Sequence, residues 1–157
     1  MTYEIGVDVL TEQITGRVRQ FGALCLRTMS DGPEVLLITT RETKRWMIPK
    51  GWPIRGLAPR KVAKREAWEE AGAIGKVQRR LFGKFRYAKV LVDGQEVRPL
   101  VEVYILKVRR LKKHFPEMTQ RDLIWLKPAE AAKRVNEPEL RKLLLSIDRK
   151  VDGRPVA

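Results

Sequence analysis

Alternating apolar and polar positions predict two strands near the start of the chain. Residues 18–28 form an apolar run with small interior side chains, and residues 34–41 form a second run that is rich in aliphatic residues. Both runs have the length and composition of β-strands. The sequence Asp31-Gly32 between them suits a tight turn with a positive φ angle, so we expect the two strands to pair as a hairpin.

The middle of the chain changes from a loop to a helix. Residues 45–56 contain two prolines and two glycines, which predicts a loop without regular structure. A helical pattern then runs over residues 59–71. Pro59 can occupy the first helical turn without losing a hydrogen bond, and Gly72 is a natural stop, so both ends of this helix are marked.

Beyond this helix the chain returns to strands before it ends in helical segments. Residues 76–92 and 97–108 are β-like and are separated by a turn at Asp93-Gly94, and residues 122–126 form a further short strand. Residues 128–150 have a helical period. The apolar stripe of the last segment, which we expect to face the core, consists of Leu140, Leu143, Leu144 and Ile147. This order of elements predicts an α+β domain with a mixed sheet and helices on its faces.

The overall composition is typical of one globular domain. The chain has 157 residues, of which 43% are hydrophobic, and we interpret residues 1–157 as a single domain with a short extension at 1–16 and a frayed tail at 151–157. No run of 18 apolar residues predicts a membrane span, and the N-terminus lacks the pattern of a secretory signal. One cysteine, Cys25, cannot form an internal disulfide. These features favour a cytoplasmic protein without a membrane partner.

The charge of the chain is far from neutral. Thirty-three Lys and Arg residues against nineteen Asp and Glu residues give a net charge of +14, and the isoelectric point is near 10.3. Residues 41–65 carry nine basic side chains and one acid, and residues 76–90 carry six basic side chains and no acid. Such a field attracts polyanions such as nucleic acid, nucleotides, inositol phosphates or a membrane surface, although a basic surface without such a partner is an alternative.

Three glutamates stand out against this basic background. Glu66, Glu69 and Glu70 lie within five positions of the predicted helix, and Glu66 and Glu70 are on one face. Like charges at this spacing destabilise a helix by about 0.2–0.5 kcal/mol per pair, a cost small enough that a solvated acidic face is one interpretation. The other is a Mg²⁺ site, because Mg²⁺ takes one or two protein carboxylates and completes its shell with water and phosphate oxygens. A third carboxylate can orient or deprotonate a water molecule.

Residues 51–73 resemble the Nudix box, G-x5-E-x7-R-E-U-x-E-E-x-G-U, in which U is an apolar residue. Gly51 matches the opening glycine, and positions 65–73 match the second half of the box in register. The length and fixed spacing of the motif make this match specific. The wider stretch from about residue 18 to residue 140 is similar to the diphosphoinositol and diadenosine polyphosphate hydrolase branch of the family.

This resemblance implies a Nudix-type α/β/α sandwich and a Mg²⁺-dependent pyrophosphohydrolase, with Mn²⁺ as a substitute metal. It implies that Glu66 and Glu70 bind the metal, and that Glu69 lies at the metal and is the general base, although Glu69 and Glu70 can exchange roles. Gly51, Arg65 and Gly72 are then motif residues. The implied substrate is a polyphosphorylated small molecule, with dinucleoside polyphosphates and diphosphoinositol polyphosphates as the leading candidates.

Leu57 departs from the box, which has a glutamate at this position. In the family that glutamate is thought to brace the box arginine, here Arg65, or to shape the loop. Its absence supports a second hypothesis, in which a catalytically weakened Nudix-like module binds polyanions such as RNA. The three retained glutamates favour the enzyme, because a site without turnover has no need to keep acids that destabilise its helix.

Several basic and aromatic residues near the loop are candidates for contacts with the substrate. Arginine suits bidentate phosphate contacts. The expected phosphate-binding residues are Arg19, Arg41, Lys50 and Arg98, with Arg121 as a weaker candidate, and each alone is equally compatible with a solvated charge. Trp46 and Trp52 flank the loop and either stack on a substrate ring or pack the loop onto the domain. Trp68 and Trp125 are expected in the core.

Overall fold

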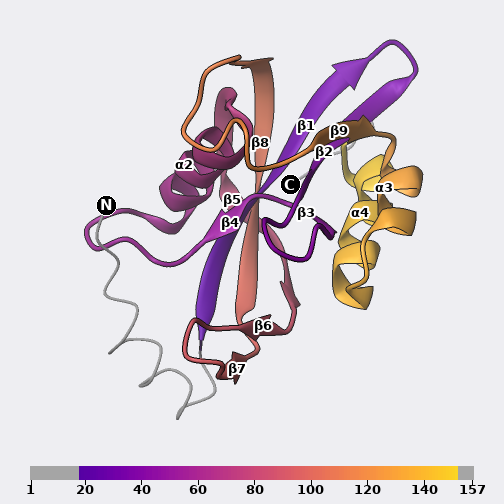
Figure 1. Cartoon of the computed structure of the whole chain (residues 1–157). Coiled ribbons are helices and arrows are strands. Elements are labelled where there is room, and N and C mark those ends of the chain that lie inside the picture. The colour runs from indigo at the N-terminus through magenta and orange to yellow at the C-terminus, as the bar shows by residue number, and fades with distance from the viewer. Residues whose placement is uncertain (1–17, 152–157) are drawn as a thin grey trace.

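The computed structural model of the chain describes residues 18–151, with side chains up to residue 147. The predicted extension at 1–16 and the predicted tail lie outside these residues, except for Val151, where the last helix ends. The described residues form a mixed sheet with helices on both faces (Figure 1). The prediction of an α+β fold with an α/β/α sandwich is therefore confirmed.

The main sheet is built around β1 (Arg19–Met29). β1 pairs antiparallel with β2 (Gly32–Thr39) through the turn predicted at Asp31-Gly32, and it pairs parallel with β8 (Leu100–Leu111). β5 (Ala73–Arg86) pairs antiparallel with β8 and forms one edge of the sheet. The strand β9 (Leu123–Leu126) pairs with β2. The combination of parallel and antiparallel ladders makes the sheet mixed, as expected.

The loop predicted at residues 45–56 is partly regular, so that prediction is wrong for two short stretches. β3 (Trp46–Met47) pairs with β2, and β4 (Lys50–Gly51) pairs with β1. Between them the carbonyl of Pro49 accepts a hydrogen bond from the N–H of Ala23, with an N···O distance of 2.9 Å. These contacts fix Lys50 and Gly51 against the central strand.

The connection between β5 and β8 is longer than a simple turn. It contains a separate two-stranded sheet of β6 (Lys89–Val90) and β7 (Glu96–Val97), which projects from one end of the main sheet (Figure 1). Gly94 lies at the turn of this hairpin and has a φ angle of 84°. The predicted turn at Asp93-Gly94 is therefore present, but it closes the small hairpin instead of joining the two long strands.

Three described helices cover the sheet. α2 (Pro59–Ala71) lies on one face, and α3 (Pro128–Arg134) and α4 (Pro138–Val151) lie on the other (Figure 1). As predicted, α2 begins at Pro59 and ends at Gly72, which is left-handed with a φ angle of 69°. No helix in residues 18–151 is both long enough and apolar enough to span a membrane.

Each face of the sheet carries its own core, and β8 contributes to both because its side chains alternate. Val101, Val103 and Ile105 pack under α3 and α4, whereas Tyr104 and Leu106 pack under α2. The predicted stripe of α4 faces the first core, with Leu140, Leu144 and Ile147 buried and Leu143 partly buried. The core position predicted for Trp68 is wrong, because this side chain is 36% exposed.

Candidate active site

Helix α2 places Glu66 and Glu70 side by side beneath β4. Both residues are buried, with exposed fractions of 4% and 6%, because they lie on the face of the helix that packs onto the sheet. Their side chains share a hydrogen bond. Two carboxyl groups can share a hydrogen bond when one of them is protonated, so this pair offers a position where a cation can replace a proton.

Gly51 makes room for the first of these carboxyl groups. A Cβ atom at position 51 would lie 2.3 Å from Cδ and 2.6 Å from each carboxyl oxygen of Glu66, so no larger residue fits without a shift. The backbone N–H of Lys50 donates to Oε1 of Glu70, with an N···O distance of 3.4 Å. The opening residue of the motif is therefore a glycine because β4 passes directly over the carboxylate pair.

Glu69 is paired with another residue of its own helix. Its Oε1 accepts a hydrogen bond from Nε of Arg65, one turn earlier on α2, at a distance of 3.1 Å. Leu57, which stands where the box has a glutamate, is partly buried against the core under α2. Arg65 therefore has a carboxylate of its own helix as its partner in this structure.

The donor set of Glu66 and Glu70 fits Mg²⁺. Both groups supply hard oxygen ligands, and one or two protein carboxylates are the usual number for this ion. Burial raises the pKa of Glu70 above its ordinary value, and the charges of Arg121 and Lys50 act in the opposite direction. Across residues 18–147, no three His, Cys, Asp or Glu side chains are grouped closely enough to bind one metal ion. Participation of Glu69 at the metal stays a prediction.

Arg121 reaches the other side of Glu70 from a distant loop. Its Nη2 lies 3.8 Å from Oε2 of Glu70, and its Nε donates to Oε1 of Glu117 at 2.8 Å. Its Nη1 donates to the carbonyl of Thr39 at 3.1 Å. The side chain of Arg121 is only 10% exposed, so this guanidinium is held in place by the protein.

Glu117 is a site residue that the sequence reasoning missed. Its backbone N–H donates to the carbonyl of Glu69 at 3.0 Å, which ties its loop to the end of α2. One signal was available, because Glu117 is the sole acid between Glu102 and Asp122 in a strongly basic stretch.

Lysine side chains complete the surroundings of Glu70. Lys50 lies with its Nζ 4.5 Å from the centre of the Tyr87 ring. Burial lowers the pKa of Lys50 to about 8, with Lys89 and Arg121 acting in the same direction and Glu70 opposing them. Burial, followed by the charge of Arg41, also lowers the pKa of Lys89. Both pKa values are lowered chiefly by burial, with a smaller contribution from neighbouring cations.

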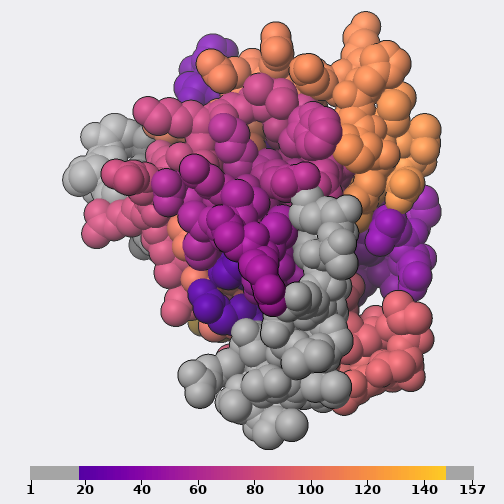
Figure 2. Space-filling view, turned by 90° about the vertical axis from the view of Figure 1, so that its left-hand side faces the viewer, coloured from indigo at the N-terminus to yellow at the C-terminus, as the bar shows by residue number. Residues whose placement is uncertain are grey.

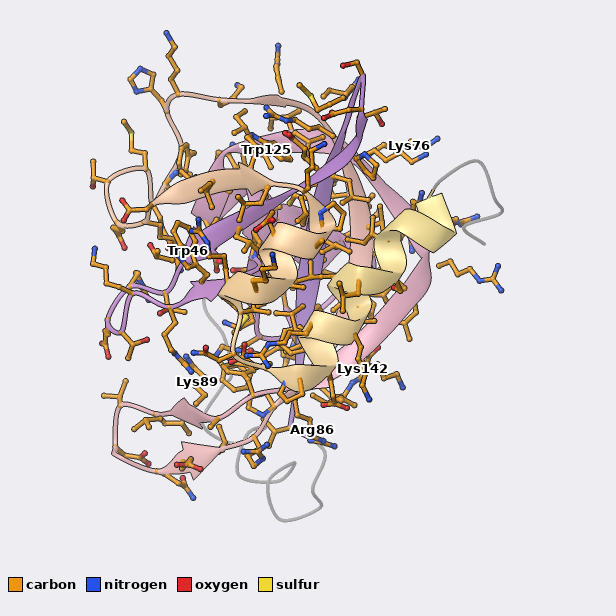
Figure 3. The ribbon with its side chains drawn as sticks, turned by 90° about the vertical axis from the view of Figure 1, so that its right-hand side faces the viewer. Trp46, Lys76, Arg86, Lys89, Trp125 and Lys142 are labelled. Carbon is orange, nitrogen blue, oxygen red and sulfur yellow. The ribbon has the colours of Figure 1, made fainter. Side chains whose placement is uncertain are left out.

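Two parts of the chain frame this cluster. Figure 3 shows Lys89 between the β6–β7 hairpin and the main body of the protein. Figure 2 shows a notch in the molecular outline between this hairpin and the segment near residues 40–45, from which Arg41 comes. A substrate entering through this notch would meet basic side chains from both sides.

The four predicted phosphate contacts divide into two pairs. Lys50 belongs to the cluster around Glu70, and Arg41 lies near Lys89, which belongs to the same cluster. Arg19 is elsewhere, with its Nε 2.7 Å from Oε2 of Glu102 and its guanidinium carbon 5.2 Å from the centre of the Phe21 ring. Arg98 is exposed next to β7 and has no described contact with the cluster. All four roles stay predictions.

Lys89 joins the cluster although it was not singled out. It belongs to the acid-free basic stretch 76–90, which was a usable signal. Trp46, by contrast, packs against the core under α3 and α4, and the guanidinium carbon of Arg134 lies 6.0 Å from its ring centre. This position agrees with a structural role for Trp46.

The NUDIX domain matches residues 18–146, and the chain belongs to this family. The fold and the carboxylate helix agree with the match. Human diphosphoinositol polyphosphate phosphohydrolase 3-alpha is 29% identical over 120 residues, which cover 75% of this chain and 69% of that protein. The bovine 3-beta protein is 28% identical over the same shares.

Solved structures show the same fold. A binary complex of the Ap4A hydrolase of C. elegans has a TM-score of 0.65 at 20% identity and covers 87% of this chain and 98% of its own. The NUDIX domain of Shewanella oneidensis NrtR in complex with ADP ribose has a TM-score of 0.62 at 12% identity, covering 95% and 99%. The family match and the hydrolase relatives confirm the prediction of a Nudix pyrophosphohydrolase.

Proposed function

We propose that this protein hydrolyses a phosphoanhydride bond in a polyphosphorylated small molecule, with Mg²⁺ as its metal and Mn²⁺ as a substitute. One observation carries the proposal: the buried pair of Glu66 and Glu70 lies among several basic side chains. These are Arg41, Lys50, Lys89 and Arg121. Catalysis of phosphoryl transfer depends chiefly on positioning and charge neutralisation, which such an arrangement provides.

Different residues would contact the metal, the substrate and the attacking water. Glu66 and Glu70 would hold Mg²⁺, which supplies charge neutralisation and a lowered pKa for bound water. Lys50 and Lys89 would bind the phosphate oxygens that face the notch. Glu69 would accept the proton of the attacking water, with Arg65 fixing the direction of its carboxylate. The roles of Glu69 and Glu70 can be exchanged.

The proposed substrates are dinucleoside polyphosphates and diphosphoinositol polyphosphates. Both carry neighbouring phosphate groups with a high negative charge, which suits a cluster of four cations. The human and bovine relatives are diphosphoinositol polyphosphate phosphohydrolases, and the C. elegans neighbour is an Ap4A hydrolase, which supports the two classes about equally.

The test is release of phosphorylated products from a panel of substrates, with Mg²⁺, with Mn²⁺ and with chelator. The panel contains diadenosine polyphosphates, diphosphoinositol polyphosphates, nucleoside triphosphates, ADP-ribose and 5′-triphosphorylated RNA. We expect metal-dependent turnover of one of the first two classes. Glu69→Gln should lower kcat by at least about 100-fold, which is the lower end of the usual contribution of a general base. We expect a loss at least as large in Glu66→Gln.

A matched control distinguishes the loss of a catalytic carboxylate from the loss of any carboxylate. Glu130→Gln removes a carboxylate of α3 that pairs with Lys133, away from the cluster, and should leave turnover unchanged. The proposal is wrong if no panel member is hydrolysed in the presence of Mg²⁺ or Mn²⁺. It is equally wrong if Glu66→Gln and Glu69→Gln turn over as fast as the native chain.

A further inference from the structure

Two acid-free basic segments lie side by side at one end of the main sheet. β5 contains five basic residues and no acid, and residues 107–113 contain five more and no acid. These segments are distant in sequence, but β5 and β8 are paired, with Lys76 opposite Lys107 and Ile74 opposite Arg110. The fold therefore brings basic residues of both segments together on one two-stranded ribbon, although Lys112 and Lys113 lie beyond the end of β8.

Lys76 and Lys107 occupy directly opposed positions. Opposed residues of an antiparallel pair have Cβ atoms about 4.5–5.5 Å apart, and like charges there are destabilising. Among residues 18–147 neither lysine takes part in an ion pair. The same sheet does pair opposite charges elsewhere, because Arg27 faces Glu34 and lies 2.7 Å from it. The two opposed lysines of the ribbon therefore repel each other, whereas the fold places an acid opposite Arg27.

A bulge adds two exposed arginines to this surface. Val77 is opposite Leu106 and Leu81 is opposite Tyr104, so three residues of β5 stand against one of β8. Arg79 and Arg80 lie in the bulge and are exposed. Charges on an edge strand such as β5 also prevent pairing with other chains. That explanation does not cover Lys107, because β8 pairs with both β1 and β5 at this residue.

The ribbon is separate from the candidate active site. Lys107 continues the alternation of Val103 and Ile105, which face α3 and α4, whereas the carboxylate pair lies under α2 on the opposite face. Arg109 lies two residues further on, at a shift in register where β8 has one residue more than β5. Figure 3 shows Lys76 next to the far end of α4, at the opposite end of the molecule from Lys89. A ligand bound along the ribbon would leave the notch open.

We propose that this basic ribbon, defined by Lys76, Arg79, Arg80, Lys107 and Arg109, binds the backbone of single-stranded RNA. Its charges follow two paired neighbouring strands and therefore form a track for a linear polyanion. Arginine and lysine contacts to phosphates supply sequence-independent binding that weakens with salt. The RNA site exists in addition to the proposed hydrolase and does not depend on it.

The test measures fluorescence anisotropy of a labelled 20-nucleotide single-stranded RNA with the full chain over a salt series, with chelator present. Lys76→Glu with Lys107→Glu should weaken binding at least tenfold. It should also reduce the slope of log K against log salt by about 0.7 for each phosphate group that the variant no longer binds. The neutral pair Lys76→Gln and Lys107→Gln should show a smaller loss in the same direction, which keeps the test valid if charge reversal impairs folding.

A control with the same change in net charge locates the site. Lys61→Glu with Lys64→Glu reverses two exposed charges on α2, and binding should stay within threefold of the native chain. Equal losses in both double variants would overturn the proposal, because attraction by the overall field alone would then explain binding. Displacement of the RNA by a polyphosphate substrate would place it at the active site and also overturn it. Binding to anionic vesicles in preference to RNA would do the same.

Discussion

The guanidinium of Arg121 lies against the carboxylate of Glu70, with 3.8 Å between Nη2 and Oε2 and with both side chains about nine-tenths buried. This arginine is also bonded to Glu117 and to the carbonyl of Thr39, so it cannot leave without breaking those contacts. An arginine stays protonated at all working pH values. Glu70 therefore already has one cation at its side before any metal binds.

Replacement of this cation should strengthen metal binding. In Arg121→Gln we expect Mn²⁺, followed by electron paramagnetic resonance of the free ion, to bind about tenfold more tightly, because a positive charge next to a ligand oxygen opposes a divalent ion. Arg27→Gln is the matched control, since Arg27 also pairs with a glutamate but lies elsewhere in the sheet, and it should leave Mn²⁺ affinity unchanged. Weaker Mn²⁺ binding in Arg121→Gln would show that the arginine orients Glu70 for the metal instead.

The close approach of Gly51 to Glu66 predicts a clash that can be relieved. Gly51→Ala should destabilise the fold by about 1–3 kcal/mol, the usual cost of overpacking, because its Cβ would lie 2.3 Å from Cδ of Glu66. Urea unfolding measures this cost. In a Glu66→Ala background the same substitution should cost less than half as much, since the clashing group is gone. An equal cost in both backgrounds would assign the effect to the backbone of β4.

The lowered pKa of Lys50 predicts a pH limit for substrate binding. Lys50 is charged below pH 8 and neutral above it, so its attraction for phosphate is present at lower pH and is lost as the pH rises through 8. We expect kcat/KM, which reports groups of the free enzyme, to fall above about pH 8. Lys50→Arg should remove this fall, because arginine stays charged. A decline of the same shape in Lys50→Arg would point to another group.

The ion pair of Arg65 and Glu69 should matter for turnover more than for folding. Arg65 is well exposed, so Arg65→Gln should change the free energy of unfolding by less than about 1 kcal/mol. If the arginine fixes the direction of Glu69, kcat should fall by about tenfold while KM changes little. Lys64→Gln, a neighbouring exposed cation on the same helix, is the control and should keep native kcat.

Local patterns in the sequence were enough to predict the principal strands and helices. Period and turn chemistry located β1, β2 and α2, because these elements depend on neighbouring residues. The pairing of β4 with β1 could not be read in this way, since Gly51 signals a loop by itself and becomes a strand residue through contact with Phe21. The core position predicted for Trp68 was wrong because the prediction rested on its apolar character, whereas the residue lies on the outer side of α2.

Local patterns likewise predicted only those parts of the candidate site that lie on one element. The spacing of Glu66 and Glu70 placed both on one helix face, and the motif identified the family. Arg121 and Glu117 reach this pair from a loop much later in the chain, and Lys89 reaches it from β6. No periodicity encodes such contacts. Only the close packing of the 112–121 segment on the end of α2 brings the first two into the site.

That packing stiffens the side of the candidate site that residues 112–121 form. Gly72 accepts a hydrogen bond from the N–H of Lys112, and Phe115 lies so close that a Cβ at position 72 would approach its ring to 2.6 Å. Together with the bond from Glu117 to Glu69, this fastens the whole segment to α2 as a single block. The β6–β7 hairpin, which carries Lys89, has a ladder that is independent of the main sheet. We therefore expect the hairpin, and not residues 112–121, to shift when substrates of different length bind.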